Sequence, residues 1–426
     1  MPDPGDTPSR RPMPDPGDAL GLFAQPYHAV VAPPDDDDNP FSGIPFLGDI
    51  AALLGNDANL WEGARQAANQ LASGGKPEHN VDPVVRHRLS EISRVAELHV
   101  AHVTNLDPTS GGRPPRTDPV TRSGWANDAL ETIRPLMDRL SERLASDQDR
   151  GQEHSPEHSM DPFAGLLRMM SPMTVAMTAG MMAGHLATKA FGNSDLGVPR
   201  QHDQVLIVPA NITDFAGEWS LDVDDVTLWV AIREHAMHSV LSVTHVHAEL
   251  DRLLHRYVDG FRRSEPTFDD LDLDLTALAD SADASQQMNT QLQRIFGNPE
   301  LLLGVSRDDS QNDTVQRLET LLSVVHAYVD DVVAQAGPRL IGGFDALSEA
   351  VRRRQVASQG TDFADRLLGV RLSAEARERG DNFIAGVTER AGREGLARLW
   401  EQGALPTPNE LAAPGLWLAR LDLPLN

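Results

Sequence analysis

The sequence predicts a mainly α-helical protein with few short strands. About ten segments carry apolar residues at helical spacing, whereas one segment has the short β-branched pattern of a strand. An ordinary soluble protein is only about one third helical. The predicted share of helix is far above this value, so we expect the core to form mainly between amphipathic helices.

The first helices are predicted from the spacing of their apolar residues. A short candidate covers residues 60–71, and a longer one covers residues 82–103, which opens with Asp-Pro. Residues 128–144 form a third candidate, with apolar residues three or four apart. Pro135 lies inside this segment and is expected to kink the helix, because proline cannot donate the helical hydrogen bond.

Two loops and one strand are predicted between the helices. Residues 108–122 and 147–161 are rich in Pro, Gly, Ser and charged residues, a composition typical of exposed loops. Residues 204–209 read Gln-Val-Leu-Ile-Val-Pro, which is short and β-branched and gives the clearest strand pattern in the chain.

The later helices include an unusual methionine-rich one. Residues 169–184 contain six methionines among small residues, and Pro172 interrupts them. This run is shorter than the roughly 20 residues that cross a bilayer, so we expect a helix buried in a tightly packed core. Further helices are expected over residues 222–238, 315–336 and 343–355.

Domain organisation follows from a change in composition near residue 39. Residues 1–38 are acidic and proline-rich and end in four aspartates, so they bury too little apolar surface to offset the entropy of ordering. We expect this tail to be disordered. Residues 39–426 are expected to form one domain, or two lobes with a pocket between them.

Composition excludes several functions. Lysine plus arginine total 37 against 63 aspartate plus glutamate, so the net charge of -26 argues against nucleic-acid and membrane partners. The chain has no cysteine, which leaves histidine and carboxylate as the expected metal ligands. Residues 1–19 lack the apolar run of a signal peptide. We therefore expect a cytoplasmic protein.

Four histidines lie close together in one segment, His235, His238, His245 and His247. On a helix, His235 and His238 are three residues apart and share a face, and Glu234 and His238 are four apart and share another. Either pair fits the start of a metal site. The same spacing equally fits surface histidines or core histidines with satisfied hydrogen bonds. Spacing alone leaves both interpretations open.

The segment around Glu234, residues 229–250, resembles the signature helix of the zincin-like metallopeptidases found mainly in actinobacteria. That helix carries His-Glu-x-x-His, often followed by a further histidine and Val-Leu. Seven other segments resemble family blocks in family order: residues 39–49, 82–84, 96–100, 208–212, 348–354, 405–411 and 416–420. The resemblance runs from about residue 39 to the C-terminus. It implies a zincin-like helical domain and a zinc-dependent hydrolase acting on peptide bonds.

The resemblance also places the family's functional residues on this chain. The first zinc histidine falls on Arg233, the catalytic glutamate on Glu234, the second zinc histidine on Met237 and the additional histidine on His238. The third ligand, a glutamate on a later helix, falls on His326. Zinc is therefore the cofactor that the resemblance implies, while all three ligand positions hold a different residue. The general base Glu234 is kept.

The replaced residues suit zinc poorly. The guanidinium of Arg233 stays protonated and cannot ligate a metal. The thioether of Met237 is soft and suits copper(I) better than zinc. On a helical wheel, His235 and His238 project about 200° and 140° from position 233, so both are expected to point away from the family's metal pocket.

Three interpretations of this pocket remain open from the sequence. In the first, Arg233 fills the metal's place by pairing with acidic residues around Glu234, and the protein is a binding or scaffold module that holds a peptide or protein in its cleft. In the second, His238, His326 and a carboxylate such as Glu234 or Glu349 bind a metal in a rebuilt hydrolytic site. In the third, the histidines are ordinary helix residues and the fold serves an unrelated interaction.

Other residues are weaker candidates. Tyr328 is a candidate catalytic residue because a phenol can donate to a developing oxyanion, although a buried phenol with a local partner is simpler. Glu349 stands beside three arginines and suits either an orienting carboxylate or a solvated helix face. His99 and His102 share a helix face without a carboxylate motif, so we predict structural roles for them.

Overall fold

The computed structural model describes residues 57–106, 115–152, 162–199, 203–263, 305–307, 311–357, 370 and 372–422. All of them belong to one compact unit, residues 50–426. The predicted disordered tail, residues 1–38, and the predicted domain start at residue 39 lie outside the described residues. The prediction of 39–426 as one domain or two lobes stays a prediction.

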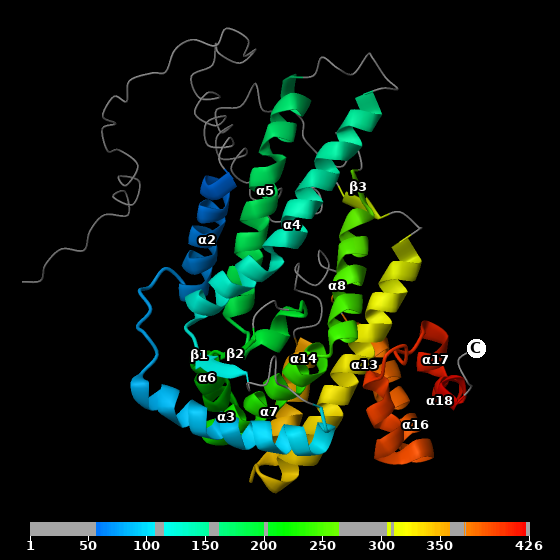
Figure 1. Cartoon of the computed structure of the whole chain (residues 1–426). Coiled ribbons are helices and arrows are strands. Elements are labelled where there is room, and N and C mark those ends of the chain that lie inside the picture. The colour runs from blue at the N-terminus through cyan, green and yellow to red at the C-terminus, as the bar shows by residue number, and fades with distance from the viewer. Residues whose placement is uncertain are drawn as a thin grey trace, which may run out of the picture. The chain divides into compact units, whose positions relative to one another are not determined.

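Three long helices pack together in the first half of the described chain: α2 (Asp57–Ser73), α4 (Arg122–Gln152) and α5 (Pro162–Ala187). Figure 1 shows them side by side. Small residues allow the close approach of α2 and α5, because a Cβ on Gly180 would lie 2.2 Å from the carbonyl oxygen of Ala64. The predicted methionine-rich helix is part of α5. The predicted loop at 147–161 is wrong for its first residues, since α4 continues to Gln152.

A second group of elements surrounds the candidate site. Helix α3 (Pro83–Thr104) packs on α7 (Val223–Leu241), and the short helix α6 (Pro209–Trp219) also contacts α7. Strands β1 (Arg116–Pro119) and β2 (Gln204–Ile207) pair in parallel, with Arg116 opposite Gln204. Strand β2 was predicted, but β1 lies in a segment predicted as a loop. Its residues, Arg-Thr-Asp-Pro, lack the apolar pattern of a strand and owe their conformation to pairing with β2.

The remaining helices complete the core. Helix α13 (Asn312–Ala336) lies against α7, α8 (Thr244–Asp259) and α16 (Ala374–Ala397). The other described elements are short, or lie at the end of the unit: η3 (Asn193–Leu196), β3 (Phe261–Arg263), β4 (Val305–Arg307), η5 (Gly337–Arg339), α14 (Phe344–Ala357), η6 (Arg398–Trp400), α17 (Pro408–Ala412) and α18 (Pro414–Asp422).

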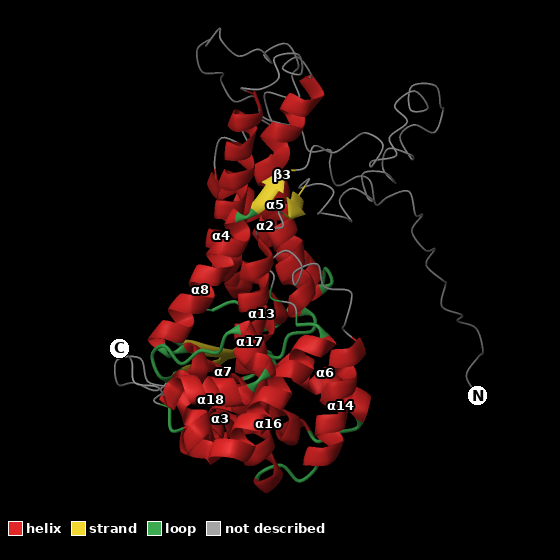
Figure 2. Cartoon of the chain, turned by 90° about the vertical axis from the view of Figure 1, so that its right-hand side faces the viewer, coloured by secondary structure: helices red, strands yellow, loops and turns green. Residues whose placement is uncertain are grey.

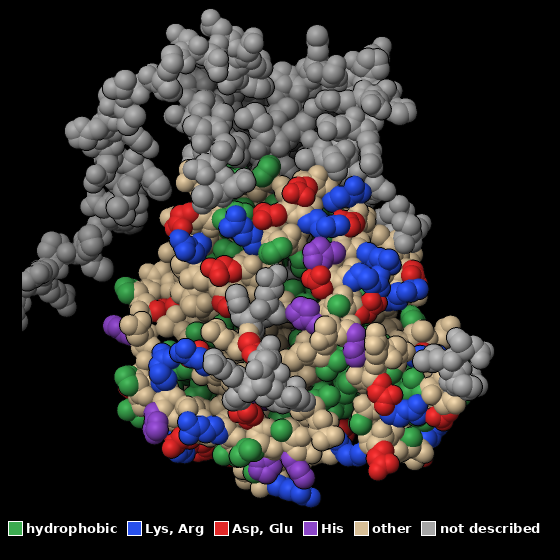
Figure 3. Space-filling view, viewed as in Figure 1, with side chains coloured by type: hydrophobic (Ala, Val, Ile, Leu, Met, Phe, Trp, Pro, Cys, Tyr) green, Lys and Arg blue, Asp and Glu red, His purple; other side chains and the backbone are tan. Residues whose placement is uncertain are grey.

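The mainly α-helical fold class is confirmed. Figure 2 shows helices dominating the described chain, and the strands of that part form only two sheets of two strands each. Buried apolar side chains from most of these helices join into one continuous core. Acidic and basic side chains are interspersed over the face shown in Figure 3. Among the described helices, none is long and apolar enough to cross a membrane.

Candidate functional site

Glu234 lies at the centre of the site, on helix α7. Asp222 caps this helix by accepting hydrogen bonds from the backbone N–H groups of Asp224 and Asp225, which fixes its first turn. Glu234 as a whole residue is only 2 % exposed. Its carboxylate accepts a hydrogen bond of 2.9 Å from the backbone N–H of Ser194 and a second one from the Ser194 hydroxyl. The carboxylate is therefore held by a neighbouring turn, η3.

Arg233, the residue before Glu234, is also buried and is paired with two carboxylates. Its Nη1 lies 3.2 Å from Oδ1 of Asp195 and 3.5 Å from Oε1 of Glu234, and it donates to the hydroxyl of Ser194. Asp195 is itself positioned, because its Oδ2 accepts a hydrogen bond of 2.6 Å from the backbone N–H of Phe191. The result is a closed network of one cation, two carboxylates and one hydroxyl.

The electrostatics of the network follow from burial and from this pairing. Burial raises the pKa of Glu234 to about 7, against the opposing effect of the Arg233 charge. Burial disfavours the charged form of Arg233, but Asp195, Glu234 and Asp330 together outweigh it and raise the pKa of the guanidinium. Arg233 is therefore a permanent cation at this position.

Gly192 provides the space that the network occupies. A Cβ at this position would lie 2.5 Å from Cδ of Glu234 and 2.7 Å from its Oε1. A larger residue would push the carboxylate away from Ser194. The side chain of Trp125 donates a hydrogen bond of 3.0 Å to the carbonyl of Gly192, which anchors the backbone there.

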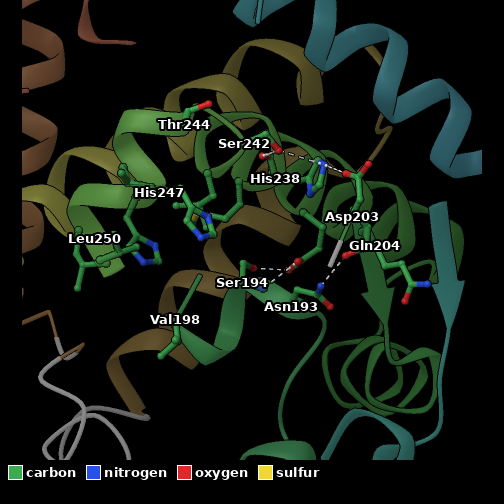
Figure 4. A pocket seen from close by; sticks show the side chains of 18 residues that line it. Asn193, Ser194, Val198, Asp203, Gln204, His238, Ser242, Thr244, His247 and Leu250 are labelled. Carbon is green, nitrogen blue, oxygen red and sulfur yellow. Dashed lines mark hydrogen bonds and ion pairs between the residues drawn. The ribbon is translucent and has the colours of Figure 1, made fainter. Parts of the chain in front are cut away.

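A cavity of about 520 Å³ opens beside Glu234, and we refer to it as the glutamate cavity. Figure 4 shows it from close by. Helix α7 lines it with four residues at positions i, i+3, i+4 and i+7, which form one helix face. Its described lining is Asn193, Ser194, Gly197, Val198, Asp203, Gln204, Val205, Glu234, Met237, His238, Leu241, Ser242, Thr244, His247, Leu250, Leu322, Val325 and His326.

His238 lines the glutamate cavity, whose described lining does not include Arg233, so the expectation that it points away from the family's metal pocket stays a prediction. Its Nε2 lies 3.2 Å from Oδ1 of Asp203 and 3.3 Å from the hydroxyl of Ser242, and Figure 4 shows the ring turned toward both residues. The helical-wheel angle was taken from position 233. The cavity instead faces Glu234, from which His238 is four residues, or about 40°, away.

His326 reaches the same cavity from helix α13. Burial, together with the positive charges of Arg233 and Arg377, lowers the pKa of its imidazole to about 3. His326 is therefore neutral at physiological pH. Two cations, Arg233 and Arg377, therefore act on the residue at which the resemblance expects the third metal ligand.

His235 is not among the described lining residues of the glutamate cavity and contacts α3 and β1 instead. Its Nε2 lies 2.6 Å from the hydroxyl of Ser93 on α3 and 3.3 Å from that of Thr117 on β1. The ring is almost fully buried, and burial lowers its pKa to about 4, with His238 adding a smaller effect. The contacts with Ser93 and Thr117 make His235 a link between helices α3 and α7 and strand β1.

Tyr328 and Glu349 lie away from the glutamate cavity. The ring of Tyr328 is buried edge-to-face against Trp400, with centroids 4.9 Å apart, and it is not part of the cavity lining. Glu349 pairs with Arg352 and Arg353 on the exposed side of α14, which fits a solvated helix face. The catalytic role predicted for Tyr328 stays a prediction, without a contact to the site that supports it.

The sequence did not identify Ser194, Asp195, Gly192 and Asp203. The first three belong to a Gly-Asn-Ser-Asp run, which indicates a turn. No local pattern shows that this turn packs against a helix 40 residues later in the chain.

The residues of this site do not fit a zinc ion. Arg233 places a guanidinium, and not a ligand, where the resemblance expects the first histidine. Within the described residues, no group of three or more histidine, aspartate or glutamate side chains could hold a metal ion. His238 and His326 share the glutamate cavity but do not converge with a carboxylate into such a group.

Comparison with known proteins gives a family and a fold. The model of the zincin-like metallopeptidase family matches residues 60–418. A crystal structure from Chloroflexus aurantiacus, described as "a putative hydrolase with a novel fold", is similar with a TM-score of 0.52 and 19% sequence identity. The match covers 86% of this chain and 99% of that chain. At this identity it shows the fold alone. No curated protein matches the sequence.

Proposed function

Because the chain belongs to the zincin-like metallopeptidase family, we propose that it is a non-catalytic member, which binds a peptide or protein segment in the glutamate cavity without zinc. The single observation that carries this proposal is the position of Arg233. Its buried guanidinium pairs with Asp195 and Glu234, at the residue on which the resemblance places the first zinc ligand.

Charge argues against a metal at this position. A divalent cation would have to approach the permanent cation of Arg233 in a buried environment, where repulsion between like charges is much stronger than in water. The Arg233 cation already interacts with the nearby carboxylates that would otherwise attract a metal. An open catalytic zinc site needs about three protein ligands, and the ligand positions here hold Arg233, Met237 and His326.

The state of Glu234 argues against catalysis by the usual route. A general base in this family takes a proton from a water bound to zinc. The carboxylate of Glu234 instead accepts two hydrogen bonds from Ser194 and pairs with Arg233. These interactions fix it as a structural group.

A binding role is supported by the cavity itself. Its volume of about 520 Å³ lies within the roughly 300–1,000 Å³ typical of ligand sites. Its lining combines apolar side chains with a few polar groups, including Asp203, His238 and His247. This combination suits a short stretch of peptide, whose side chains need apolar surface and whose backbone needs hydrogen-bond partners.

Restoring the family residues tests the proposal. We expect the unmodified chain to show no peptidase activity on a mixed peptide library in the presence of zinc. The triple variant Arg233→His, Met237→His and His326→Glu is expected to take up zinc. His99→Ala serves as the control for histidine substitutions, because His99 lies outside the described lining of the glutamate cavity and its loss should leave zinc content unchanged.

One observation favours a second candidate function. His238 and His326 line the same cavity as Glu234, as a rebuilt metal site would require. Zinc-dependent peptidase activity in the unmodified chain, abolished by His238→Ala and by His326→Ala but not by His99→Ala, would overturn the non-catalytic proposal in favour of that site.

A further inference from the structure

Arg233 lines a second cavity, and we refer to it as the arginine cavity. Its volume is about 210 Å³. Among its described lining residues are four basic side chains, Lys189, Arg233, Arg354 and Arg377, and one carboxylate, Asp195. In a chain with a net charge of -26, such a concentration of positive charge is unusual.

The four basic residues come from different elements and converge on this space. Arg233 comes from α7, Arg354 from α14 and Arg377 from the start of α16, and Lys189 follows α5. Arg354 is held in place, because it donates a hydrogen bond to the carbonyl of Lys189 and its guanidinium carbon lies 3.6 Å from the ring centroid of Phe191. The cavity wall is thus built from packed side chains.

Within the described part of the chain, some N–H groups of Arg233 have no acceptor and can serve a ligand. Its hydrogen bonds to the described residues all come from Nη1, which reaches Ser194, Asp195 and Glu234. Its Nε–H and Nη2–H groups make no hydrogen bond to the described residues, although the side chain is only 11% exposed. A buried guanidinium with unused donors on a cavity wall is suited to a bidentate acceptor such as a carboxylate.

The positive charges at this cavity also lower the pKa values of neighbouring basic groups. Burial lowers the pKa of Arg354, and the nearby cation of Arg233 lowers it further, against the opposing effect of Asp195. Burial, Arg233 and Arg377 together lower the pKa of His326, which lies on the same wall. An anion in the cavity would relieve this repulsion.

The rest of the wall is apolar, which limits the kind of anion. Eight apolar side chains are among its described lining residues: Leu186, Ala190, Phe191, Leu196, Trp229, Val351, Val370 and Leu372. The volume lies below that of typical drug-sized sites, so the ligand must be small. A carboxylate on a short apolar body satisfies both parts of the wall, whereas a fully hydrated ion such as phosphate would leave the apolar part without contacts.

We propose that the arginine cavity binds a carboxylate on a small apolar body through Arg233, Arg354 and Arg377. Two ligands share this chemistry, a free short-chain carboxylic acid and the C-terminal residue of a peptide. The arginine and glutamate cavities share Ser194, Gly197 and His326 in their linings. A peptide in the glutamate cavity can therefore present its terminus here, and to that extent the inference rests on the proposed function.

Isothermal titration calorimetry on the full chain tests this inference. The probes are isovalerate, a short peptide ending in leucine with a free carboxylate, the same peptide as its C-terminal amide, and inorganic phosphate. We expect both free carboxylates to bind and the amide to bind at least about tenfold more weakly than the acid peptide, because the amide cannot form charge-assisted hydrogen bonds. Tighter binding of the peptide than of isovalerate identifies a peptide terminus as the ligand, and the reverse identifies a free acid.

The variants separate this site from general charge effects. Arg377→Gln is expected to weaken carboxylate binding at least about tenfold. Arg352→Gln, on the same helix as Arg354 but exposed and paired with Glu349, is the matched control and should leave binding unchanged. Circular dichroism verifies folding, and Arg354→Gln replaces Arg377→Gln if the latter does not fold.

Three results would overturn the inference: no binding of either carboxylate, equal binding by the unmodified chain and Arg377→Gln, or phosphate binding as tight as that of the carboxylates. The zinc content of the same preparation separates the two proposals. A chain that binds neither carboxylate nor zinc overturns this inference alone, whereas stoichiometric zinc overturns the proposed function whichever carboxylate binds.

Discussion

Nη1 of Arg233 on helix α7 lies 3.2 Å from Oδ1 of Asp195 in the turn η3, 38 residues earlier in the chain. This ion pair joins the helix that carries Glu234 to the turn whose Ser194 holds the Glu234 carboxylate. The residue at which the resemblance expects the first zinc ligand is here the cation of a buried network. The stability of the network and its response to pH are therefore measurable consequences.

Removing the cation should destabilise the protein. In Arg233→Met, the buried carboxylate of Glu234 and that of Asp195 lose their partner, so we expect the free energy of unfolding to fall by about 3 kcal/mol. Urea denaturation at neutral pH measures the change. Arg352→Met, which breaks an exposed pair, should have little effect. Equal effects of the two variants would mean that the Arg233 network does not stabilise the fold.

Glu234 should make stability depend on pH in a defined direction. Its pKa rises from an ordinary 4.5 to about 7 on folding. Between these values the folded state holds one proton more than the unfolded state, so the free energy of unfolding decreases as pH rises from about 4.5 to about 7 and then levels off. Glu234→Gln removes this contribution. The free energy of unfolding of the unmodified chain and of Glu234→Gln is measured from about pH 4.5 to about pH 7. As pH rises, the unmodified chain should lose stability relative to the variant. A difference that stays constant over this range would contradict the prediction.

Gly192 should not tolerate a side chain. In Gly192→Ala, the new methyl would meet Cδ and Oε1 of Glu234, so we expect a loss of about 1–3 kcal/mol in the free energy of unfolding. Gly217 on α6 is the matched control, because a Cβ there meets nothing within 4 Å. Gly217→Ala should be neutral or stabilising, since alanine is the better helix former. Thermal unfolding of Gly192→Ala and Gly217→Ala compares the two effects. Equal stability of the two variants would mean that the backbone at Gly192 can move away from Glu234 without cost.

His235 should act as a structural residue that is sensitive to acid. Its pKa falls from an ordinary 6.5 to about 4 on folding. As pH falls from about 6.5 to about 4, the unfolded state takes up a proton that the folded state does not, so this residue's contribution to stability is progressively lost. His235→Gln should lower the free energy of unfolding by about 1–3 kcal/mol at pH 7, because Ser93 and Thr117 lose their partner. The deficit should shrink at pH 5, and a deficit that grows there would argue against a neutral, buried imidazole.

Several helices of this fold were predictable because their own segments carry a signal. Apolar spacing and the Asp-Pro start identified α3, and the same pattern identified α13. Strand β2 was recognisable from its β-branched residues. Strand β1 was not, because Arg116 and Asp118 have no strand preference and the strand exists only through its pairing with β2.

From the sequence, the resemblance identified candidate residues on helix α7 and His326 on helix α13. Resemblance located Glu234 and the replaced ligands Arg233 and Met237, since they lie in one continuous segment. Ser194 and Asp195 could not be predicted, because their role depends on a contact between segments that are distant in sequence. The position of His238 in the glutamate cavity could not be predicted either, because a helical wheel shows which residues share a face but does not show which face lines a cavity.

The zinc content of the unmodified chain, purified without chelators and measured by inductively coupled plasma mass spectrometry, tests the central claim most directly. The account predicts far less than one zinc ion per chain, with stoichiometric zinc only after Arg233→His, Met237→His and His326→Glu are combined. One zinc ion per unmodified chain, lost on His238→Ala or His326→Ala, would show that Arg233 has not replaced the metal and would contradict the account.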